Sequence, residues 1–315
     1  MKKVMLKNKF LLALTFLTVI VASCSKDDDG NDNVPNTISN IVVNDDDLST
    51  LEAAVVKAGL VETLNGPGPF TLFAPTNEGF ENAGITSDVL SGLSADAVKN
   101  ILLYHVIPAA IPAASVPAGP NAKVIAANGD SVFVTSNSNG VFINGVKVET
   151  ADIAATNGII HKIGNVLMPA VGNIVEAAQA DTSLSYLVAA VLRASTGSID
   201  IAGILSGSNI LTVFAPTNNA FRSAGFATID QINAADPDAL AGILAYHVLN
   251  GRTFSSDLTD GATAPTLAGG ATVTIGVSGG VTVKGNSNTD ASDVLKANIV
   301  ATNGVIHVID QVLLP

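Results

Sequence analysis

Two stretches of this 315-residue sequence share one pattern and decide its fold: FTLFAPTNEGF at residues 70–80 and LTVFAPTNNAF at residues 211–221. Seven of the eleven positions are identical. The shared Ala-Pro-Thr-Asn predicts a turn, because Pro fixes φ and the Thr and Asn side chains bind backbone groups. We interpret the pair as two copies of one structural unit.

Two more blocks recur in the same order and extend the duplication over most of the chain. ILLYHVI (101–107) returns as ILAYHVL (243–249), and ATNGIIHKIGNVLMP (155–169) returns as ATNGVIHVIDQVLLP (301–315). The three blocks are displaced by 141, 142 and 146 residues, so the copies have nearly the same length. The sequence therefore predicts two tandem domains, residues 38–169 and 173–315, whose short connector leaves little independent movement.

The sequence predicts helices at the beginning of each copy. Apolar residues at 48, 51, 55 and 58 lie on one stripe of a predicted helix, and Ser49 and Glu52 form a candidate capping box. Three acids at 45–47 precede this helix. Capping and solvation explain these acids better than a metal site does.

After each Tyr-His pair the pattern changes to short apolar runs separated by glycine-containing turns, which predict antiparallel hairpins. The runs are 123–127, 131–135, 141–143 and 146–149 in the first copy, and 271–277 and 281–284 in the second. Helices followed by hairpins favour an α+β fold over a parallel α/β sheet.

The first 23 residues predict a secretory signal peptide. Four lysines within residues 1–9 precede a mostly apolar stretch, residues 10–22, that is too short to span the bilayer core comfortably. The leader ends in Val-Ala-Ser-Cys24, which resembles a bacterial lipobox. The resemblance implies that Cys24, the only cysteine, is acylated, becomes the first mature residue and anchors the protein to a membrane. The alternative is an ordinary secretory signal followed by an incidental free cysteine.

Residues 24–37 predict a solvated tether that starts at the acylated cysteine. Residues 25–33 are polar throughout and carry four acids. Ser25 and this acidic run resemble the outer-membrane sorting and surface-export signals of Bacteroidetes lipoproteins, which implies a lipid-anchored protein exposed at the cell surface. The run lacks the spaced partners and the terminal Glu of a calcium-binding loop.

The charge balance excludes one class of partner. The chain has 27 acidic and 15 basic residues, a formal net charge of −12, and loss of the four lysines of the leader leaves −16. So acidic a surface repels phosphate backbones, and we exclude nucleic acid as a partner. Hydrophobic residues make up 48% of the sequence, which is enough to bury a core.

The three repeated blocks together resemble the motif set of the fasciclin domain, and both copies carry them in order over about residues 38–315. The resemblance implies a β-wedge with helices packed around it, and a role in adhesion or extracellular-matrix contact. Animal members of the family offer Asp-Ile pairs to integrins, and Asp152-Ile153 matches such a pair. Asn298 replaces this acid in the second copy, and Lys162 departs from the usual closing block of the family.

All four histidines lie inside repeated blocks beside Ile or Val, so we expect neutral, hydrogen-bonded side chains in the interior. Metal or catalytic roles would need partners, and the sequence has no His-x-x-x-His, no His-Glu-x-x-His and no second thiol. We therefore predict no cofactor and no enzyme activity. Candidates for an interaction site or a structural motif are Tyr104, His105, Asp152, Ile153, His161, Tyr246, His247 and His307.

These features favour an adhesion or interaction protein that binds a protein or matrix partner. The alternative is a glycan-binding or polysaccharide-handling surface module. Sugar faces are usually gripped by aromatic rings, but this chain has no Trp, and its Tyr residues at 104, 186 and 246 lie on helices predicted to pack inward. A glycan site here would rely on hydrogen-bonding side chains, and its binding would be weak.

Overall fold

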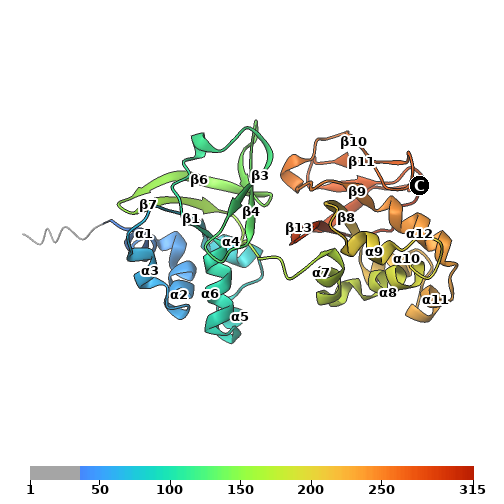
Figure 1. Ribbon diagram of the computed structural model, residues 1–315, viewed down its shortest axis with the longest axis horizontal. Helices are drawn as coiled ribbons and strands as arrows, with labels where there is room; N and C mark the ends of the chain where they lie inside the picture. The colour runs from blue at the N-terminus through green and yellow to red at the C-terminus, as the bar shows by residue number, and fades with distance from the viewer. Residues whose placement is uncertain (1–35) are drawn as a thin grey trace, which may run out of the picture. The chain divides into compact units, whose positions relative to one another are not determined.

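The two copies of the repeat fold into the same succession of elements (Figure 1). The computed structural model describes residues 36–315, which fall within one compact unit. The predictions about the signal peptide, Cys24 and nearly all of the tether lie outside the described residues.

The first copy, residues 36–169, places most of its helices before its hairpins. Its helical elements are α1 (Ile38–Val43), η1 (Asp46–Leu48), α2 (Ser49–Lys57), α3 (Val61–Asn65), α4 (Asn77–Asn82), α5 (Ser87–Gly92), α6 (Ala95–Tyr104) and η2 (Ala113–Ser115). Its strands are β1 (Phe70–Pro75), β2 (Val106–Ile107), β3 (Gly119–Ile125), β4 (Ser131–Asn137), β5 (Gly140–Ile143), β6 (Val146–Ala155) and β7 (Gly158–Ile163).

The second copy, residues 173–315, repeats this order. Its helical elements are α7 (Ile174–Ala180), η3 (Thr182–Leu184), α8 (Ser185–Ala194), α9 (Ile201–Ser206), α10 (Asn218–Ser223), α11 (Ile229–Ala234), α12 (Pro237–Tyr246) and η4 (Ser255–Asp257). Its strands are β8 (Leu211–Pro216), β9 (Val248–Asn250), β10 (Thr263–Pro265), β11 (Thr272–Gly276), β12 (Thr282–Lys284), β13 (Ser292–Ala301) and β14 (Gly304–Ile309).

Each copy contains a mixed seven-stranded sheet. The strand order is β2-β1-β7-β6-β5-β4-β3 in the first copy and β10-β11-β12-β13-β14-β8-β9 in the second. The predicted antiparallel hairpins are present, and the α+β class is confirmed. Each sheet also contains one parallel pair, β1 with β7 and β8 with β14, which the hairpin signals did not predict. The pair forms because the first strand of each copy lies beside the last one, far away in sequence.

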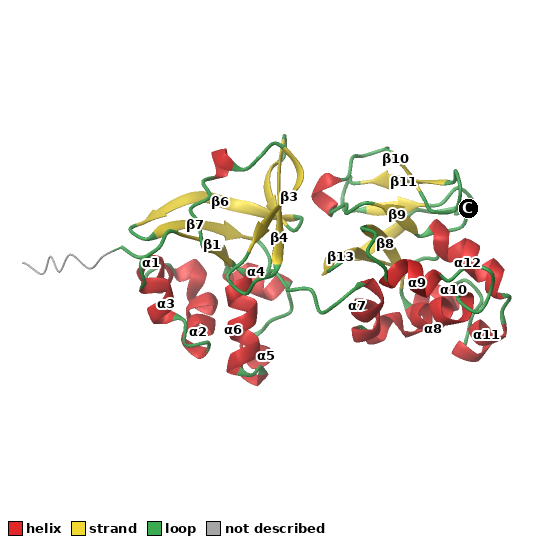
Figure 2. Cartoon of the chain, in the orientation of Figure 1, coloured by secondary structure: helices red, strands yellow, loops and turns green. Residues whose placement is uncertain are grey.

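In each copy most of the helices lie on one side of the sheet (Figure 2). The main core of the first copy forms between these two layers, where Leu51 and Leu102 from helices pack with Leu72 and Ile160 from strands. A second cluster surrounds Tyr104, whose ring packs among side chains of the hairpin strands. The hydrophobic effect therefore holds the helices to the sheet at two places in each copy, since the second copy has an equivalent pair of clusters.

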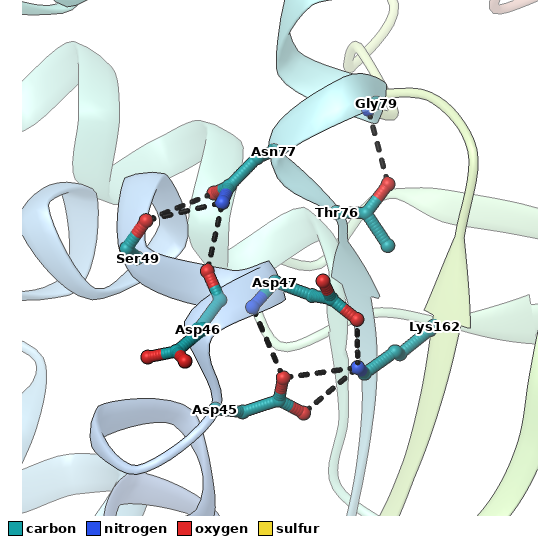
Figure 3. A network of polar contacts seen from close by, with 8 residues as sticks. All are labelled: Asp45, Asp46, Asp47, Ser49, Thr76, Asn77, Gly79 and Lys162. Carbon is teal, nitrogen blue, oxygen red and sulfur yellow. Dashed lines mark hydrogen bonds and ion pairs between the residues drawn. The ribbon is translucent and has the colours of Figure 1, made fainter.

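The side chains of Thr76 and Asn77 bind backbone groups as predicted, but the residues form no separate turn, because Ala74 and Pro75 belong to β1 and Asn77 begins α4 (Figure 3). The Thr76 hydroxyl accepts a hydrogen bond from the Gly79 amide (3.1 Å) and caps α4. Asn77 reaches back to η1 and α2, where its Oδ1 accepts from the Thr50 amide (2.9 Å) and its Nδ2 donates to the Asp46 carbonyl (2.8 Å). This segment thus joins the end of β1 to the start of α2.

The predicted capping box from Ser49 to Glu52 is wrong. Ser49 is the first residue inside α2, and no side chain of the preceding residue caps this helix. Asp45 instead caps the short helix η1 by accepting from the Asp47 amide (3.1 Å). An additional turn of helix therefore precedes α2, so the cap lies four residues earlier than the sequence pattern indicated.

The Asn of the Thr-Asn-Gly block ties the beginning of each copy to its last hairpin. Asn157 Oδ1 accepts from the Ile38 amide (2.9 Å), and its Nδ2 donates to the carbonyls of Leu64 (2.8 Å) and Gly66 (2.9 Å). Asn303 makes the equivalent three bonds in the second copy. One amide side chain thus satisfies three backbone groups from two distant segments.

Candidate functional site

The repeated tyrosines hold the helices to the hairpins. Tyr104 ends α6, and its hydroxyl donates to the Ser131 carbonyl (2.9 Å) and accepts from Asn144 Nδ2 (2.9 Å). Tyr246 is equally buried and donates to the Thr272 carbonyl (2.6 Å). Burial raises the pKa of Tyr104 to about 12, so the phenol stays protonated at neutral pH.

His105 and His247 join the helix that carries them to the closing block of the same copy. His105 Nε2 accepts from the Leu167 amide (2.9 Å), so Nδ1 carries the proton and donates to the Ile101 carbonyl (2.8 Å). His247 makes the same two bonds in the second copy. Burial lowers the pKa of both histidines to about 4 and keeps them neutral at neutral pH.

His161 and His307 bind a different part of the backbone. His161 lies beside an irregular stretch of β6, and His307 lies beside the equivalent stretch of β13. His161 Nδ1 accepts from the Asp152 amide (3.2 Å), and Nε2 donates to the Ile111 carbonyl (2.9 Å). The imidazole stacks on Phe73 with 5.8 Å between ring centroids. His307 repeats these contacts, and burial lowers its pKa.

The structure does not bring the four histidines together. Each is buried, and each binds backbone groups of its own copy. Within residues 36–315 no group of three or more His, Cys, Asp or Glu side chains is placed to hold a metal ion. No helix in the described part of the chain has the length and hydropathy needed to cross a bilayer.

Asp152 is the candidate residue that reaches solvent most fully. It lies in β6 with φ of +59°, a left-handed conformation that Asp and Asn tolerate better than other side chains. Its carboxylate accepts from the Ala113 amide (2.9 Å) at the start of η2. Ile153 is half-buried and packs against the helical core, so only the acid of the Asp-Ile pair is fully presented.

The surface around this acid, which we name the Asp152 face, consists of residues 109–115 and Asp152. Four of these residues besides Asp152 are exposed, namely Ala109, Ala110, Ala114 and Ser115. Residues 109–115 contain no charged side chain. The face therefore exposes mainly small, uncharged side chains and a single carboxylate.

The equivalent face of the second copy is covered by the first copy. Arg252 Cζ lies 4.2 Å from the centre of the Phe133 ring, and Phe254 lies 6.0 Å from Phe133 between centroids. Asn121 Nδ2 donates to the Arg252 carbonyl (2.8 Å) and to the Asp257 carboxylate (3.2 Å). We call this contact between the copies the junction.

Asn298, the counterpart of Asp152, takes part in the junction. It has φ of +64° and accepts from the Ser255 amide (2.8 Å), as Asp152 does from Ala113. Gly145, in the turn between β5 and β6, lies so close to Asn298 that a Cβ atom at this position would lie only 2.5 Å from Asn298 Nδ2 and would force that side chain to move. A neutral amide therefore stands where the open face of the first copy carries its acid.

Arg252 is held firmly at this contact. Its guanidinium donates to the carbonyls of Ala301 (3.1 Å) and Thr302 (3.3 Å) and to that of Gly304, all near the turn between β13 and β14. Burial lowers the pKa of Arg252 to about 10, so it stays charged at neutral pH. The cation thus fixes the turn while its face rests on Phe133.

The acids at 45–47 serve capping, as expected, and also an ion pair that the sequence did not reveal (Figure 3). Lys162 Nζ lies 2.8 Å from Asp45 and 3.0 Å from Asp47. Burial alone would lower the pKa of Lys162, but the hydrogen bonds and charges of Asp45 and Asp47 outweigh it and raise that pKa. The second copy has Val308 in place of this lysine.

Sequence reasoning missed the junction residues because they lie outside the repeated blocks. Asn121, Phe133 and Arg252 belong to no motif, and their partners are more than a hundred residues away. Asn144 carried only a turn signal, although its side chain binds Tyr104. An informative signal existed in the difference between the copies, because Arg252, Phe254 and Asp257 replace smaller uncharged residues of the first copy.

Comparison with known proteins gives consistent results across the described chain. The family model described as "Fasciclin domain" matches residues 46–169 and 187–315. Human periostin is 34% identical over 263 residues, which cover 81% of this chain and 29% of periostin. The pig transforming growth factor-beta-induced protein ig-h3 is 31% identical over 257 residues, which cover 80% of this chain and 35% of that protein. The chain thus spans about a third of the length of these two animal relatives.

A bacterial relative and a solved structure also match. The immunogenic protein MPB70 of Mycobacterium bovis is 34% identical over 140 residues, which cover 44% of this chain and 67% of that protein. Among solved structures, a FAS1 domain pair from the insect cell adhesion molecule Fasciclin I aligns with a TM-score of 0.41 and 19% identity. That alignment covers 85% of this chain and 97% of the other.

Proposed function

Because the chain belongs to the fasciclin domain family, we propose that it is a lipid-anchored extracellular protein that adheres to a protein or matrix partner through its fasciclin domains. The match to the family extends over both copies. The repeated polar residues are occupied with internal hydrogen bonds, which supports an interaction role over catalysis.

One observation carries this proposal, and it is the contrast between two equivalent faces. In the second copy the face around Asn298 is covered by a protein surface, namely β3, β4 and the Gly145 turn of the first copy. In the first copy the Asp152 face is open within the described residues. Because this face contacts protein in the second copy, we infer that the equivalent open face of the first copy can bind a protein partner.

The chemistry of the Asp152 face defines the partner. Small apolar side chains permit close approach of a flat surface, and one exposed carboxylate offers a charge-assisted hydrogen bond. The partner is therefore a protein surface that presents a basic or hydrogen-bond-donating side chain among small apolar residues.

The lipid anchor and the location belong to the same proposal. The lipobox-like end of the leader at Cys24 and the acidic tether support acylation and exposure at the outer face of a bacterial outer membrane. Replacing Cys24 with Ser should release the protein from the membrane fraction, which fractionation and mass spectrometry of the mature N-terminus would measure. A variant that stays in the membrane fraction would contradict the anchor.

The Asp152 face is tested with Asp152→Asn, because asparagine is the residue at the equivalent position of the second copy, Asn298. Asp152→Asn keeps the acceptor that caps η2, as Asn298 shows for η4, and removes only the charge. We expect vesicles bearing the full-length variant to bind collagen- or fibronectin-coated surfaces about tenfold more weakly than wild type, the size of one charge-assisted hydrogen bond.

Asp88→Asn provides the matched control, because Asp88 is an exposed acid on α5, away from this face. It should bind as wild type does. Equal attachment of wild type and Asp152→Asn would remove the face from the interface. Attachment to polysaccharide-coated surfaces with none to protein would favour glycan handling instead.

A further inference from the structure

An open cleft of about 440 Å³ lies between α2 and α5 of the first copy. Side chains of α2 form one wall, and side chains of α5 form the opposite wall. This volume falls within the range of small-molecule binding sites. The cleft shares no residue with the Asp152 face, so a group bound in it would be independent of the proposed docking at that face.

The two copies carry different residues at one position of this cleft. Thr50 of α2 lines it, and Tyr186 of α8 is the equivalent residue of the second copy. The equivalence rests on the backbone, because the amide of each residue donates to Oδ1 of the repeated asparagine, Asn77 or Asn218, at 2.9 Å. The small side chain of Thr50 therefore stands where the second copy has a phenol ring.

The ring of Tyr186 joins α8 to the segment before α11, which is the counterpart of α5. Tyr186 is buried, and its ring lies 6.3 Å from that of Phe221 between centroids. Its hydroxyl donates to the Ala227 carbonyl (3.0 Å). The first copy keeps the aromatic neighbour as Phe80, but Thr50 supplies no ring. The second copy thus fills with its own side chain the space that is open between α2 and α5.

The lining of the cleft suits a ring that carries a hydroxyl group. Leu90 is buried, belongs to the helical core and gives the cleft an apolar contact surface. Thr50 and Ser87 add hydroxyl groups, which both donate and accept hydrogen bonds. An apolar ring edge and a phenol hydroxyl would therefore both find partners there.

A cation lines the cleft, as a cation lies over the ring in the second copy. Lys57 Nζ reaches from α2 to α5 and donates to the Ser91 carbonyl (2.7 Å). An ammonium group has three donors, so two remain for other contacts. In the second copy Arg222 Cζ lies 4.9 Å from the centre of the Tyr186 ring. A positive charge beside an aromatic ring is thus common to the filled site and the open one.

We propose that the cleft between α2 and α5 binds a tyrosine side chain of a partner protein, which takes the place that Tyr186 takes in the second copy. The ring contacts Leu90 and lies beside the Lys57 ammonium group, and the phenol hydroxyl pairs with the hydroxyl of Thr50 or Ser87. The choice of an aromatic ring over an aliphatic group or an anion rests on Tyr186, which shows what the equivalent walls hold. Tyrosine is also a frequent anchor residue of protein interfaces.

An NMR titration of the full-length chain with N-acetyl-tyrosinamide tests the cleft. N-acetyl-leucinamide and inorganic phosphate serve as an aliphatic and an anionic probe. We expect the backbone amides of Thr50, Ser87 and Ser91 to show saturable shifts with the tyrosine probe and none with the other two.

Thr50→Tyr is the decisive variant, because it gives the first copy the residue of the second. The new ring should fill the cleft, raise Tm through added apolar burial and abolish binding of the tyrosine probe. Thr274→Tyr is the matched control, since Thr274 is an exposed threonine that does not line the cleft. It should leave binding unchanged.

Lys57→Met should weaken binding of the tyrosine probe about threefold, the size of an exposed cation–π contact. Lys99→Met is its control, because Lys99 is an exposed lysine of the same copy outside the cleft. The proposal is overturned if the tyrosine probe gives no saturable shift, if leucinamide or phosphate binds as well, or if Thr50→Tyr or Lys57→Met binds as wild type does. A lower Tm of Thr50→Tyr would also overturn it, because the cleft would then be unable to hold a phenol ring.

Discussion

The interiors of the two copies match in their hydrogen bonds, whereas their equivalent outer faces differ in most side chains. His105 and His247 bind equivalent amides and carbonyls, and Asn157 and Asn303 make the same three bonds. The faces differ, with Ala, Pro and Ser in the first copy where the second has Arg252, Phe254 and Asp257. The shared residues therefore maintain the fold, and the residues that differ determine what each copy contacts.

Acidification should cause the largest loss of stability in the interior that the two copies share. The unfolded histidine takes up a proton below its usual pKa of 6.5, whereas His105 and His247 in the folded protein do so only near a pKa of about 4. The unfolded state thus binds more protons in this window, and stability falls as the pH drops from about 6.5 to about 4. We expect a loss of about 3 kcal/mol for each histidine, measured by chemical unfolding across this range.

Stability that stays constant through this pH window would contradict the buried neutral state of the two histidines. Replacement of either one by Gln should remove its share of the pH dependence and leave the share of the other.

Removal of one imidazole at neutral pH should have the next largest effect. His105→Ala leaves the Leu167 amide and the Ile101 carbonyl without partners, and we expect a loss of about 3 kcal/mol in the free energy of unfolding. His247→Ala should lose a similar amount, since its bonds are the same. Thermal unfolding would measure both, and Lys99→Ala, an exposed change on α6, serves as the control.

Unchanged melting of His105→Ala together with lost partner binding would reassign this histidine from structure to site. A large difference between His105→Ala and His247→Ala would break the equivalence of the interiors.

The junction should show a smaller, pairwise effect. Phe133 and Arg252 are in cation–π contact, and a double-mutant cycle of Phe133→Ala and Arg252→Met should give a coupling energy of about 1 kcal/mol. Thr274 occupies the equivalent strand position in the second copy, where it is exposed, so Thr274→Ala should show no coupling with Arg252→Met. Additive effects of the first pair would contradict a direct contact between the copies.

The ion pair of Lys162 should contribute least. Lys162→Met should cost about 0.5 kcal/mol at neutral pH, because Asp47 is largely exposed and screened by solvent. The raised pKa means that this contribution is complete below pH 10.5 and is lost as the pH rises through the pKa of the folded state. Chemical unfolding at low and high salt would measure it, with Lys147→Met as a control that salt should not distinguish from wild type.

Much of the fold could be predicted because the sequence contains two copies of one unit, which can be aligned with each other. The residues that recur, such as Thr76, Asn157 and His161, bind backbone groups within their own copy, so their spacing is the same in both copies and visible in the sequence. The parallel pairing of β1 with β7 left no such trace, because periodicity describes each strand but not its neighbour.

The candidate sites were less predictable, since they depend on distances between residues far apart in sequence. Asp152 was selected through a family resemblance, but its open position became evident only by contrast with the covered Asn298. Asn121 has an ordinary sequence environment, and its hydrogen bond to the Arg252 carbonyl forms only because β3 meets the Arg252 segment.

The three hydrogen bonds that Asn157 makes to Ile38, Leu64 and Gly66 have a mechanical consequence. Tension that arrives along the backbone at Ile38 does not peel α1 away alone, because Asn157 passes it to the hairpin of β6 and β7 near the centre of the sheet. We expect such tension to load the hydrogen bonds between β6 and β7 together with those of α1. If the protein is held at one end and pulled at the other, the attachment of α1 to the turn before β7 should raise the force needed to unfold the first copy.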